Sequence, residues 1–401
     1  MCEQLTPNFD GIPIVCLSSA GWDTDTPVNV HHIMKRLAID HQILWMDSQP
    51  MRVPSLSRSD VGKVIRRVRS SAGGIRELQD NIWGITPRAL PVSSVGLVQN
   101  WSDHRLQKAI SKAIETLGFR SFILWTFLPS WAGLAGNMGE ALTIYHCVDD
   151  YEANPRVNSQ LVMDLERQLL GKADLVIVTS EPLLRKLEQF HRNVHLVQAG
   201  VDDGFFLDDE PPIPDDLSDI PVPRIGFTGA VSEYKVDIPL MVEAAERYPD
   251  VSFVLIGPVG AGDPNTDISK LRKQSNVYLI GSRDHDSLPD YLYHMDALML
   301  PSPDTPTMKS SFPVKLFEYL ATGKPILARA QEPLEEYASL VYLAESRVDF
   351  INGIGRVLDD NDISKRKARV EIAKLNKWEH RIIQLGKIVE ETLVLKLAGD
   401  A

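Results

Sequence analysis

Two charged side chains three positions apart, Lys315 and Glu318, lie in a segment with helical spacing that starts just after Pro313. Residues at i and i+3 share one face of a helix, and proline is favoured in a first turn. A carboxylate can accept hydrogen bonds from both hydroxyls of a diol such as ribose, and a lysine one turn earlier can reach a phosphate. The alternative is an ordinary charged pair on a solvated helix surface.

Glycine-containing turns follow two of the apolar runs. After the run that ends before Gly229, the chain reaches Lys235, where a phosphate can meet a helix N-terminus. The alternative is a solvated lysine beside Glu233 and Asp237. Near the start of the chain, the turn that contains Gly21 can offer backbone N–H groups to a phosphate.

Asp149 and Asp150 end an apolar run that contains His146. If this run is a buried strand, the carboxylates lie at the carboxyl edge of a sheet. A partly desolvated carboxylate there suits a general base. The alternative roles are helix N-capping or turn formation for the aspartates, and a structural role for the histidine.

The elements that would position these residues form two series of strands alternating with helices, typical of parallel sheets covered on both faces. We expect a fold of two doubly wound α/β domains facing across a cleft, with ligands at the carboxyl ends of the strands. The strands expected in the first half are 12–17, 43–46, 82–85, 122–125, 142–145 and 175–178, with helices at 100–116 and 159–170. Those expected in the second half are 225–228, 251–256, 277–280, 297–300 and 326–328, with helices at 239–247, 288–294, 313–321, 362–376 and 377–397.

Composition places the chain among ordinary globular proteins: 401 residues, 44% hydrophobic and 24% charged. Its net charge of -12 argues against a nucleic-acid partner. Eight acidic residues and no basic residue lie between Val201 and Ile220, a composition typical of a linker. The three cysteines, Cys2, Cys16 and Cys147, predict neither a disulfide framework nor a zinc site. Without a signal peptide or a membrane span, we expect a cytoplasmic protein.

A basic segment runs from Arg52 to Arg88, with eight Lys or Arg residues against three acidic ones. Val61, Val64, Ile65 and Val68 have helical spacing beside these charges. A basic amphipathic helix of this kind can lie on an anionic membrane or meet a lipid-diphosphate acceptor, which would place the protein at the inner face of the membrane. The alternative is a solvated helix face.

Five segments, which follow one another along the chain in the family's order, resemble the GT-B glycosyltransferases, and family 4 in particular. Residues 226–237 (GFTGAVSEYKVD) resemble the opening of the donor domain, and residues 312–325 (FPVKLFEYLATGKP) the nucleotide-sugar signature. Residues 199–202 (AGVD) resemble the end of the first domain, and residues 378–381 (WEHR) the start of a closing helix that crosses back onto it. Residues 145–151 (YHCVDDY) are most similar to transferases of bacterial polysaccharide assembly, such as the teichuronic acid and xanthan glucuronosyltransferase types.

The resemblance implies an acceptor domain at 1–200, an acidic linker at 201–220, a donor domain at 221–376 and a crossover helix at 377–401. It implies that Lys235 holds the diphosphate and that Glu318 binds the ribose. The complete set of donor-binding residues expected is Gly21, Gly229, Lys235, Ser282, Arg283, Ser310, Lys315 and Glu318. Asp149, Asp150 and His146 are the candidates for catalysis, and no metal or other cofactor is expected.

The chain departs from family 4 at two positions. Ser310 stands eight residues before Glu318, where the family usually has a glutamate, and Ala230 follows Gly229, where it usually has arginine. We predict a glycosyltransferase that moves a sugar from a nucleoside diphosphate donor to a polysaccharide or lipid-linked glycan acceptor. The departures keep two alternatives open: a nucleotide-sugar epimerase of the same fold, and a catalytically silent nucleotide-sugar-binding partner subunit.

Overall fold

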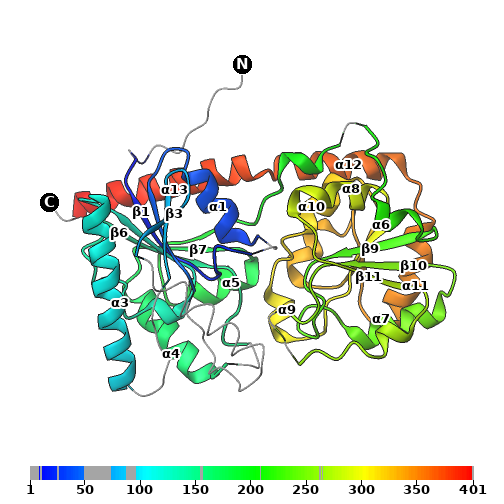
Figure 1. The fold of residues 1–401 in the computed structure, drawn as a ribbon, viewed down its shortest axis with the longest axis horizontal. Helices are drawn as coiled ribbons and strands as arrows, with labels where there is room; N and C mark the ends of the chain where they lie inside the picture. Colours follow the sequence, from blue (N-terminus) through cyan, green and yellow to red (C-terminus); the bar gives the residue numbers. More distant parts are fainter. Residues whose placement is uncertain are drawn as a thin grey trace. The chain divides into compact units, whose positions relative to one another are not determined.

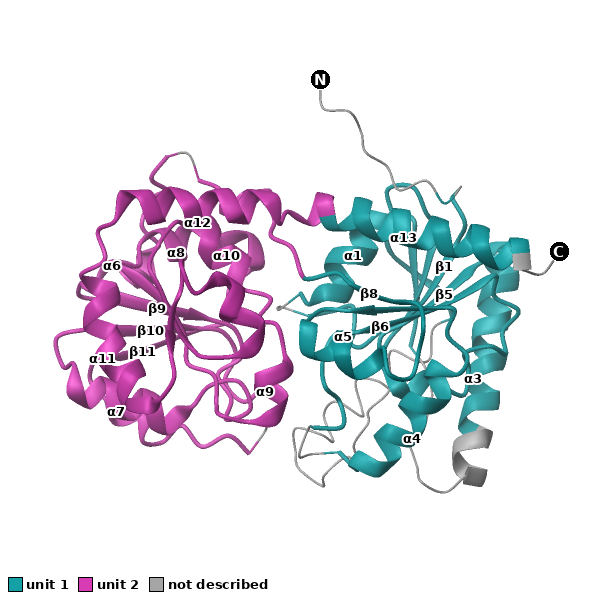
Figure 2. Ribbon diagram, turned by 180° about the vertical axis from the view of Figure 1, so that it is seen from behind, with its two compact units in different colours: residues 1–198, 381–401 teal, residues 199–380 magenta. Residues whose placement is uncertain are grey.

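The computed structural model describes residues 9, 11–24, 27–48, 74–86, 96–153, 157–207, 209–261, 263 and 265–399, and the side chains within these ranges except those of 96–101. The chain forms two compact units, shown in different colours in Figure 2. Unit 1 consists of Met1–Gln198 and Arg381–Ala401, and unit 2 of Ala199–His380.

Unit 1 is built on an eight-stranded sheet whose strand order is β3-β4-β2-β1-β5-β6-β7-β8. Every neighbouring pair is parallel except β3 and β4, which form an antiparallel pair joined at Asn81, a residue with φ of 60°. The strands are β1 (Ile14–Leu17), β2 (Ile43–Met46), β3 (Arg76–Gln79), β4 (Ile82–Ile85), β5 (Ile123–Thr126), β6 (Leu142–Cys147), β7 (Leu175–Val178) and β8 (Val194–Leu196).

Strands β1, β2, β5, β6 and β7 are buried along their whole length, because helices cover both faces of this sheet. Burial on both faces explains why their sequences are continuous apolar runs without alternation. The helices of unit 1 are α1 (Asn29–Leu37), α3 (Gly96–Leu117), α4 (Ser159–Leu170), α5 (Glu181–Leu187) and most of α13 (Trp378–Gly399) (Figure 1).

Unit 2 is built on a six-stranded, fully parallel sheet with the order β11-β10-β9-β12-β13-β14. The strands are β9 (Arg224–Thr228), β10 (Ser252–Ile256), β11 (Val277–Gly281), β12 (Ala297–Leu300), β13 (Ile326–Arg329) and β14 (Tyr342–Ala344). The helices are α6 (Asp215–Ser218), α7 (Ile238–Arg247), α8 (Leu288–Tyr293), α9 (Pro306–Ser310), α10 (Leu316–Ala321), α11 (Arg347–Leu358) and α12 (Ile363–Leu375).

Alternate residues of the unit 2 strands enter two hydrophobic cores, one on each face of the sheet. Val254 and Leu298 pack with residues of α8 and α10, whereas Phe253 and Ala297 pack with residues of α7 and α11. Helices on both faces of a parallel sheet leave its carboxyl edge as the place where loops can hold a ligand.

The acidic segment from Val201 to Ile220 differs from the linker that its composition predicts, because it is part of unit 2. Val201, Phe205, Leu217 and Ile220 are buried and pack into the core on the α10 face. The apolar residues between the charges are therefore what fixes this segment to the domain.

The last helix returns to unit 1. The backbone N–H of Val201 donates to the Asn376 carbonyl at 3.0 Å, and a Cβ on Gly200 would lie 2.8 Å from Cα of Trp378, so only glycine fits there. In unit 1, Lys396 of α13 forms an ion pair with Asp174 at 2.7 Å. The predicted fold of two doubly wound domains with a returning C-terminal helix is confirmed.

The sequence reading missed several short or amphipathic elements. Strands β3, β8 and β14 were not predicted, since they have three or four residues each and are only partly buried. Helix α10 begins at Leu316, with Lys315 at its N-cap, later than the predicted start at Pro313. Most of the basic segment 52–88, including the predicted amphipathic helix, lies outside the described residues. In the described part of the chain, no helix has the length and apolar content to span a membrane.

Candidate donor site at the carboxyl edge of the unit 2 sheet

Glycines bring the ends of three neighbouring strands of unit 2 into close contact. The N–H of Gly229, after β9, donates to the Ile256 carbonyl at 2.8 Å, and the N–H of Gly257, after β10, donates to the Gly281 carbonyl at 2.8 Å. Gly229 has φ of 120° and Gly257 φ of 147°, and a Cβ on Gly257 would lie 2.1 Å from the Gly229 carbonyl oxygen. This edge therefore requires glycine, and it exposes backbone rather than side chains.

Lys315 extends from the start of α10 to this glycine edge. A Cβ on Gly229 would clash with the Lys315 Nζ, which also lies 4.5 Å from the centre of the Phe227 ring. Burial lowers the pKa of Lys315 to about 8; the charge of Lys235 also lowers it, and that of Glu318 opposes the shift. Lys315, Lys235 and Glu318 thus lie within electrostatic reach of one another.

Lys235 lies in the turn between β9 and α7, where its N–H donates to the Ser232 carbonyl at 2.9 Å. Its Nζ lies 4.7 Å from the centre of the Tyr234 ring. The N-terminus of α7 is capped by the side chain of Asp237, which accepts from the N–H of Leu240 at 3.0 Å. The positive charge at this turn therefore comes from the lysine, while an aspartate occupies the helix cap.

Glu318 is buried in the first turn of α10, only 8% exposed. The next residue, Tyr319, fixes this helix to the strand edge, since its hydroxyl accepts from the N–H of Thr228 at 2.8 Å. The imidazole Nε2 of His285 lies 3.2 Å from Oε1 of Glu318. The structure thus brings Gly229, Lys235, Lys315 and Glu318 together as the sequence predicts, and adds His285.

Ser282 and Arg283 follow β11 at the same edge, but Arg283 is already engaged. It forms an ion pair with Asp216 of α6, and its Nε donates to the Tyr291 hydroxyl at 2.8 Å. Its Nη1 donates to the Ser282 carbonyl at 2.7 Å. Burial alone would raise the pKa of Asp216, but the contacts with Arg283 and Tyr291 outweigh burial and lower this pKa.

Ser310, the last residue of α9, bonds within its own helix. Its hydroxyl donates to the carbonyls of Pro306 at 3.3 Å and Thr307 at 3.2 Å. Its neighbour Lys309 is exposed and pairs with Asp304 at 2.7 Å. Ser310 is thus held within the short helix α9.

In unit 1, Gly21 lies in the loop between β1 and α1. Its carbonyl lies 3.0 Å from Nε2 of His31, and the N–H of Trp22 donates to Asp47 at 3.0 Å. The loop is thereby held by α1 and by the residue after β2.

His146, in β6, is enclosed by aromatic rings. It is 1% exposed and stacks on Phe127, with ring centres 5.0 Å apart. Burial lowers its pKa to about 3, so the ring is neutral, and Nδ1 has no hydrogen-bond partner among the described residues. These surroundings are those of a packed core side chain.

The two aspartates after β6 differ in their contacts. Asp150 forms an ion pair with Lys186 of α5 at 2.8 Å, and Lys186 also contacts Glu152 at 2.9 Å and Glu166 at 3.9 Å. Asp149 is half-buried, and its Oδ1 accepts from the N–H of Asp150 at 3.1 Å. Of the two, Asp150 is held in a structural network.

The sequence reading missed His285 and Lys186. His285 stands in a polar loop two residues after Arg283, and Lys186 is one charge among several on an ordinary amphipathic helix. No local pattern distinguishes either residue, because their partners lie 33 and 36 positions away in Glu318 and Asp150.

Comparisons with known proteins agree with this arrangement. The family model for glycosyl transferases group 1 matches residues 222–360, which hold the glycine edge and α10. Residues 222–360 therefore form a group 1 glycosyl transferase domain, and the chain as a whole has the GT-B fold. TuaH of Bacillus subtilis (strain 168), a protein named for glycosyl transfer in teichuronic acid biosynthesis, is 27% identical over 286 residues, covering 66% of this chain and 70% of its own.

Solved structures with the same fold cover nearly the whole chain. Sucrose-phosphate synthase from Thermosynechococcus elongatus has a TM-score of 0.69 and 17% identity, over 96% of this chain and 99% of its own. Anabaena HepE, solved in complex with UDP and glucose, has a TM-score of 0.67 and 15% identity, over 95% of this chain and all of its own (100%). At these identities the likeness shows the fold alone.

Proposed function

We propose that this protein is a glycosyltransferase and that it binds a nucleoside diphosphate-sugar at the carboxyl edge of the unit 2 sheet. The observation that carries the proposal is the convergence of Lys235, Lys315 and Glu318 on the glycine edge at Gly229. In this proposal the Glu318 carboxylate accepts the ribose hydroxyls, and the two lysines hold the diphosphate.

The two lysines would also stabilise the leaving group. Negative charge grows on the diphosphate as the bond to the sugar breaks, so fixed positive charge nearby lowers the barrier. We expect these two cations to meet the need for charge without a metal ion. Transfer that continues at an undiminished rate in excess EDTA would support this, and loss of transfer that Mg²⁺ restores would contradict it.

UDP is the first nucleotide to test, since the fold relative HepE was solved with it. A thermal-shift comparison of UDP, GDP and dTDP measures which one stabilises the protein, because a ligand that binds only the folded state raises the unfolding temperature. In Glu318→Gln, donor affinity and turnover should fall together. An unchanged shift and unchanged turnover in this variant would contradict the site.

For the acceptor, we propose a bacterial polysaccharide or a lipid-linked glycan, supported by the likeness to TuaH. A product that carries the transferred sugar distinguishes transfer from epimerisation, which would yield a free epimerised nucleotide sugar. It equally excludes a silent binding subunit. We also propose that the transferred sugar is a hexose. A further proposal is that residues 52–88 contact an anionic membrane, which would place the protein at the inner face of that membrane. Unchanged liposome binding after removal of Arg66, Arg67 and Arg69 would contradict the membrane contact.

If the reaction inverts configuration, we propose Asp149 as the base that deprotonates the acceptor hydroxyl. The ion pair between Asp150 and Lys186 supports this choice, since it already engages the Asp150 carboxylate in a contact with helix α5. Asp149→Asn should lower turnover by about 100-fold or more with little change in UDP affinity. Asp150→Asn is the matched control, and an equal loss of turnover in both variants would contradict the assignment.

A further inference from the structure

His285 contacts the buried carboxylate of Glu318. Its Nε2 lies 3.2 Å from Oε1, and the two residues come from separate elements of unit 2: the 3-10 turn His285–Ser287 and helix α10. Among the described residues, this is the only hydrogen bond to the Glu318 side chain. The other carboxylate oxygen therefore keeps its capacity to accept a hydrogen bond from a ligand.

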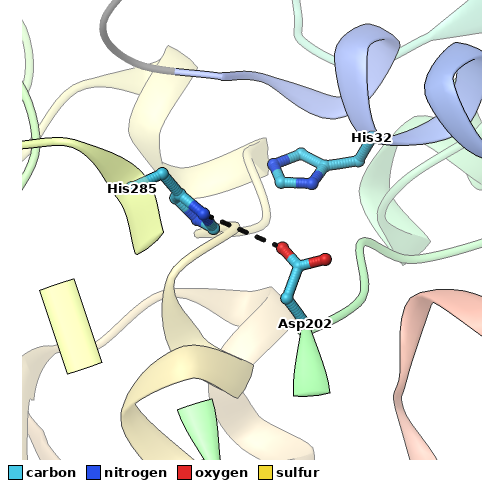
Figure 3. A group of neighbouring side chains, drawn as sticks. All are labelled: His32, Asp202 and His285. Carbon is cyan, nitrogen blue, oxygen red and sulfur yellow. Dashed lines mark ion pairs between the residues drawn. The ribbon is translucent and has the colours of Figure 1, made fainter. Parts of the chain in front are cut away.

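The other side of the imidazole faces two more carboxylates. Nδ1 lies 3.9 Å from Oδ2 of Asp202 and 3.9 Å from Oδ1 of Asp286 (the Asp202 pair is the dashed line in Figure 3). The Phe205 ring meets the imidazole edge to face, with centres 5.3 Å apart. Since Phe205 is itself 2% exposed, it gives the ring a fixed support.

The charges around His285 favour its protonated form. Burial alone would lower the pKa of this histidine, but the hydrogen bond and charge of Glu318, with the charges of Asp202 and Asp286, outweigh it and raise the pKa. A protonated imidazole carries a proton on both nitrogens, so Nε2 donates to Glu318 while the positive ring lies near the charge of Asp202.

The same contact explains why Lys315 and Glu318 do not form an ion pair. They are three residues apart, a spacing at which a lysine and a glutamate commonly pair. In the described part of the chain, neither Lys315 nor Lys235 forms an ion pair. With His285 holding Glu318, the Lys315 Nζ stays over the Phe227 ring, next to Gly229.

We propose that His285 is a positioning residue for donor binding: it fixes the Glu318 carboxylate for the ribose diol and keeps it away from Lys315. This inference rests on the proposed donor site. A side chain held before binding loses less conformational entropy when the ligand arrives, which raises affinity. Pairing of Glu318 with Lys315 would instead compete with both the diol and the diphosphate.

The test is a calorimetric titration of the full-length protein with UDP and with 2′,3′-dideoxy-UDP, which lacks the diol. His285→Ala should weaken UDP binding about tenfold and should weaken binding of the dideoxy nucleotide by a clearly smaller factor, because only UDP also loses the fixed contact to its diol. His285→Gln, which can still donate from Nε2, should recover most of the lost affinity. The matched control is His294→Gln, a half-buried unit 2 histidine that contacts the Pro211 carbonyl at 2.9 Å.

The pH dependence gives a second readout. Because the pKa of His285 is raised, wild-type affinity for UDP should fall as the pH rises above the ordinary histidine range and His285 loses its proton, whereas affinity for the dideoxy nucleotide should change less. The His285→Gln variant should lack this difference between the nucleotides. Equal losses for both nucleotides in His285→Ala would show a general structural role and overturn the proposal.

Failure of the proposal and failure of the donor site are distinguishable. If Glu318→Gln weakens UDP binding but His285→Ala does not, the site stands and the positioning role is wrong. If Glu318→Gln leaves UDP binding unchanged, the donor site itself is wrong. The His285→Ala variant can prove too unstable to titrate, and His285→Gln then provides the test. If the UDP affinity of His285→Gln depends on pH in the same way as that of the wild type, the proposed role of His285 is wrong.

Discussion

At the carboxyl edge of the unit 2 sheet, Lys235 and Lys315 lie near Glu318, and neither lysine forms an ion pair with a described residue. At the carboxyl edge of the unit 1 sheet, one lysine, Lys186, contacts three carboxylates, those of Asp150, Glu152 and Glu166. Both edges come from doubly wound sheets and have the same kinds of side chains. The difference is that Lys186 pairs with carboxylates within unit 1, whereas Lys235 and Lys315 of unit 2 form no ion pair with a described residue, as the proposed donor site requires.

The surroundings of each lysine give this contrast its physical basis. Burial and the nearby Lys235 lower the pKa of Lys315, so its charge is costly until an anion arrives. Burial would also lower the pKa of Lys186, but its hydrogen bonds to Asp150 and Glu152 outweigh that effect and raise it. A binding site is therefore better indicated by a charge that the fold leaves unpaired than by a cluster of charges.

The largest effect that would test this contrast is expected for Lys315→Met. The variant removes a charge close to the proposed diphosphate, and kcat/KM should fall by about 1,000-fold, or roughly 4 kcal/mol. Its fold should persist, because methionine is easily accommodated in an apolar setting. Steady-state transfer kinetics and a thermal unfolding curve measure the two quantities.

The matched control for this variant is Lys324→Met. Lys324 is another half-buried lysine of unit 2, with its Nζ 5.3 Å from the centre of the Tyr293 ring. A comparable fall in kcat/KM in this variant would show that any half-buried lysine of the unit supports activity. The distinction between the two edges would then fail.

The next effect concerns stability in unit 1. Lys186→Met leaves Asp150, Glu152 and Glu166 without their shared cation, and removal of one partner of a buried ion pair costs about 3 kcal/mol. We expect the free energy of unfolding to fall by about that amount, while UDP affinity stays within about twofold of the wild type. Urea unfolding measures the loss of stability, and titration with UDP measures the affinity. A large loss of UDP affinity with unchanged stability would contradict a structural role for Lys186.

The sequence alone predicts those residues of the proposed site that stand in a local pattern, but not the contacts between distant segments. Gly229, Lys235, Lys315 and Glu318 could be found because each stands in a local pattern: a strand followed by a glycine turn, or two charges on one helix face. The ion pair between Arg283 and Asp216 could not be predicted, because 67 residues separate the two and the acidic segment was expected to be a linker. Contacts between distant segments depend on packing, which a single sequence does not display.

The pH dependence of donor affinity gives a smaller effect. With a pKa of about 8 in the folded protein, Lys315 is charged below that pH and neutral above it. A diphosphate needs the charged form, so affinity for UDP should fall above about pH 8 by at most tenfold per pH unit. Unlike the His285 effect, this loss should persist with 2′,3′-dideoxy-UDP and be absent in Lys315→Met.

The same pKa predicts a stability change of the opposite sign without ligand. An unfolded lysine titrates near 10.4, so from about pH 8 to about pH 10.4 the unfolded chain binds more protons than the folded one at this position. The contribution of Lys315 to the free energy of unfolding therefore rises with pH in that window. Lys315→Met should remove this rise, and the difference between the two proteins in urea unfolding at the two pH values measures it.

The smallest effect is expected at His146, which sequence reasoning placed among the catalytic candidates. The side chain is buried against Phe127 and Trp125, and burial lowers its pKa to about 3, so it carries no proton that it could donate as an acid near neutral pH. His146→Leu places an apolar side chain of similar length in this position and removes a buried nitrogen that has no hydrogen-bond partner among the described residues. We expect kcat/KM within about threefold of the wild type and a change in unfolding free energy below about 1.5 kcal/mol. A fall in kcat of about 100-fold with an unchanged fold and unchanged UDP affinity would instead make His146 a catalytic residue. The carboxyl edge of the unit 1 sheet would then contain a catalytic group in addition to its ion pairs, and ion pairing would not distinguish the two edges.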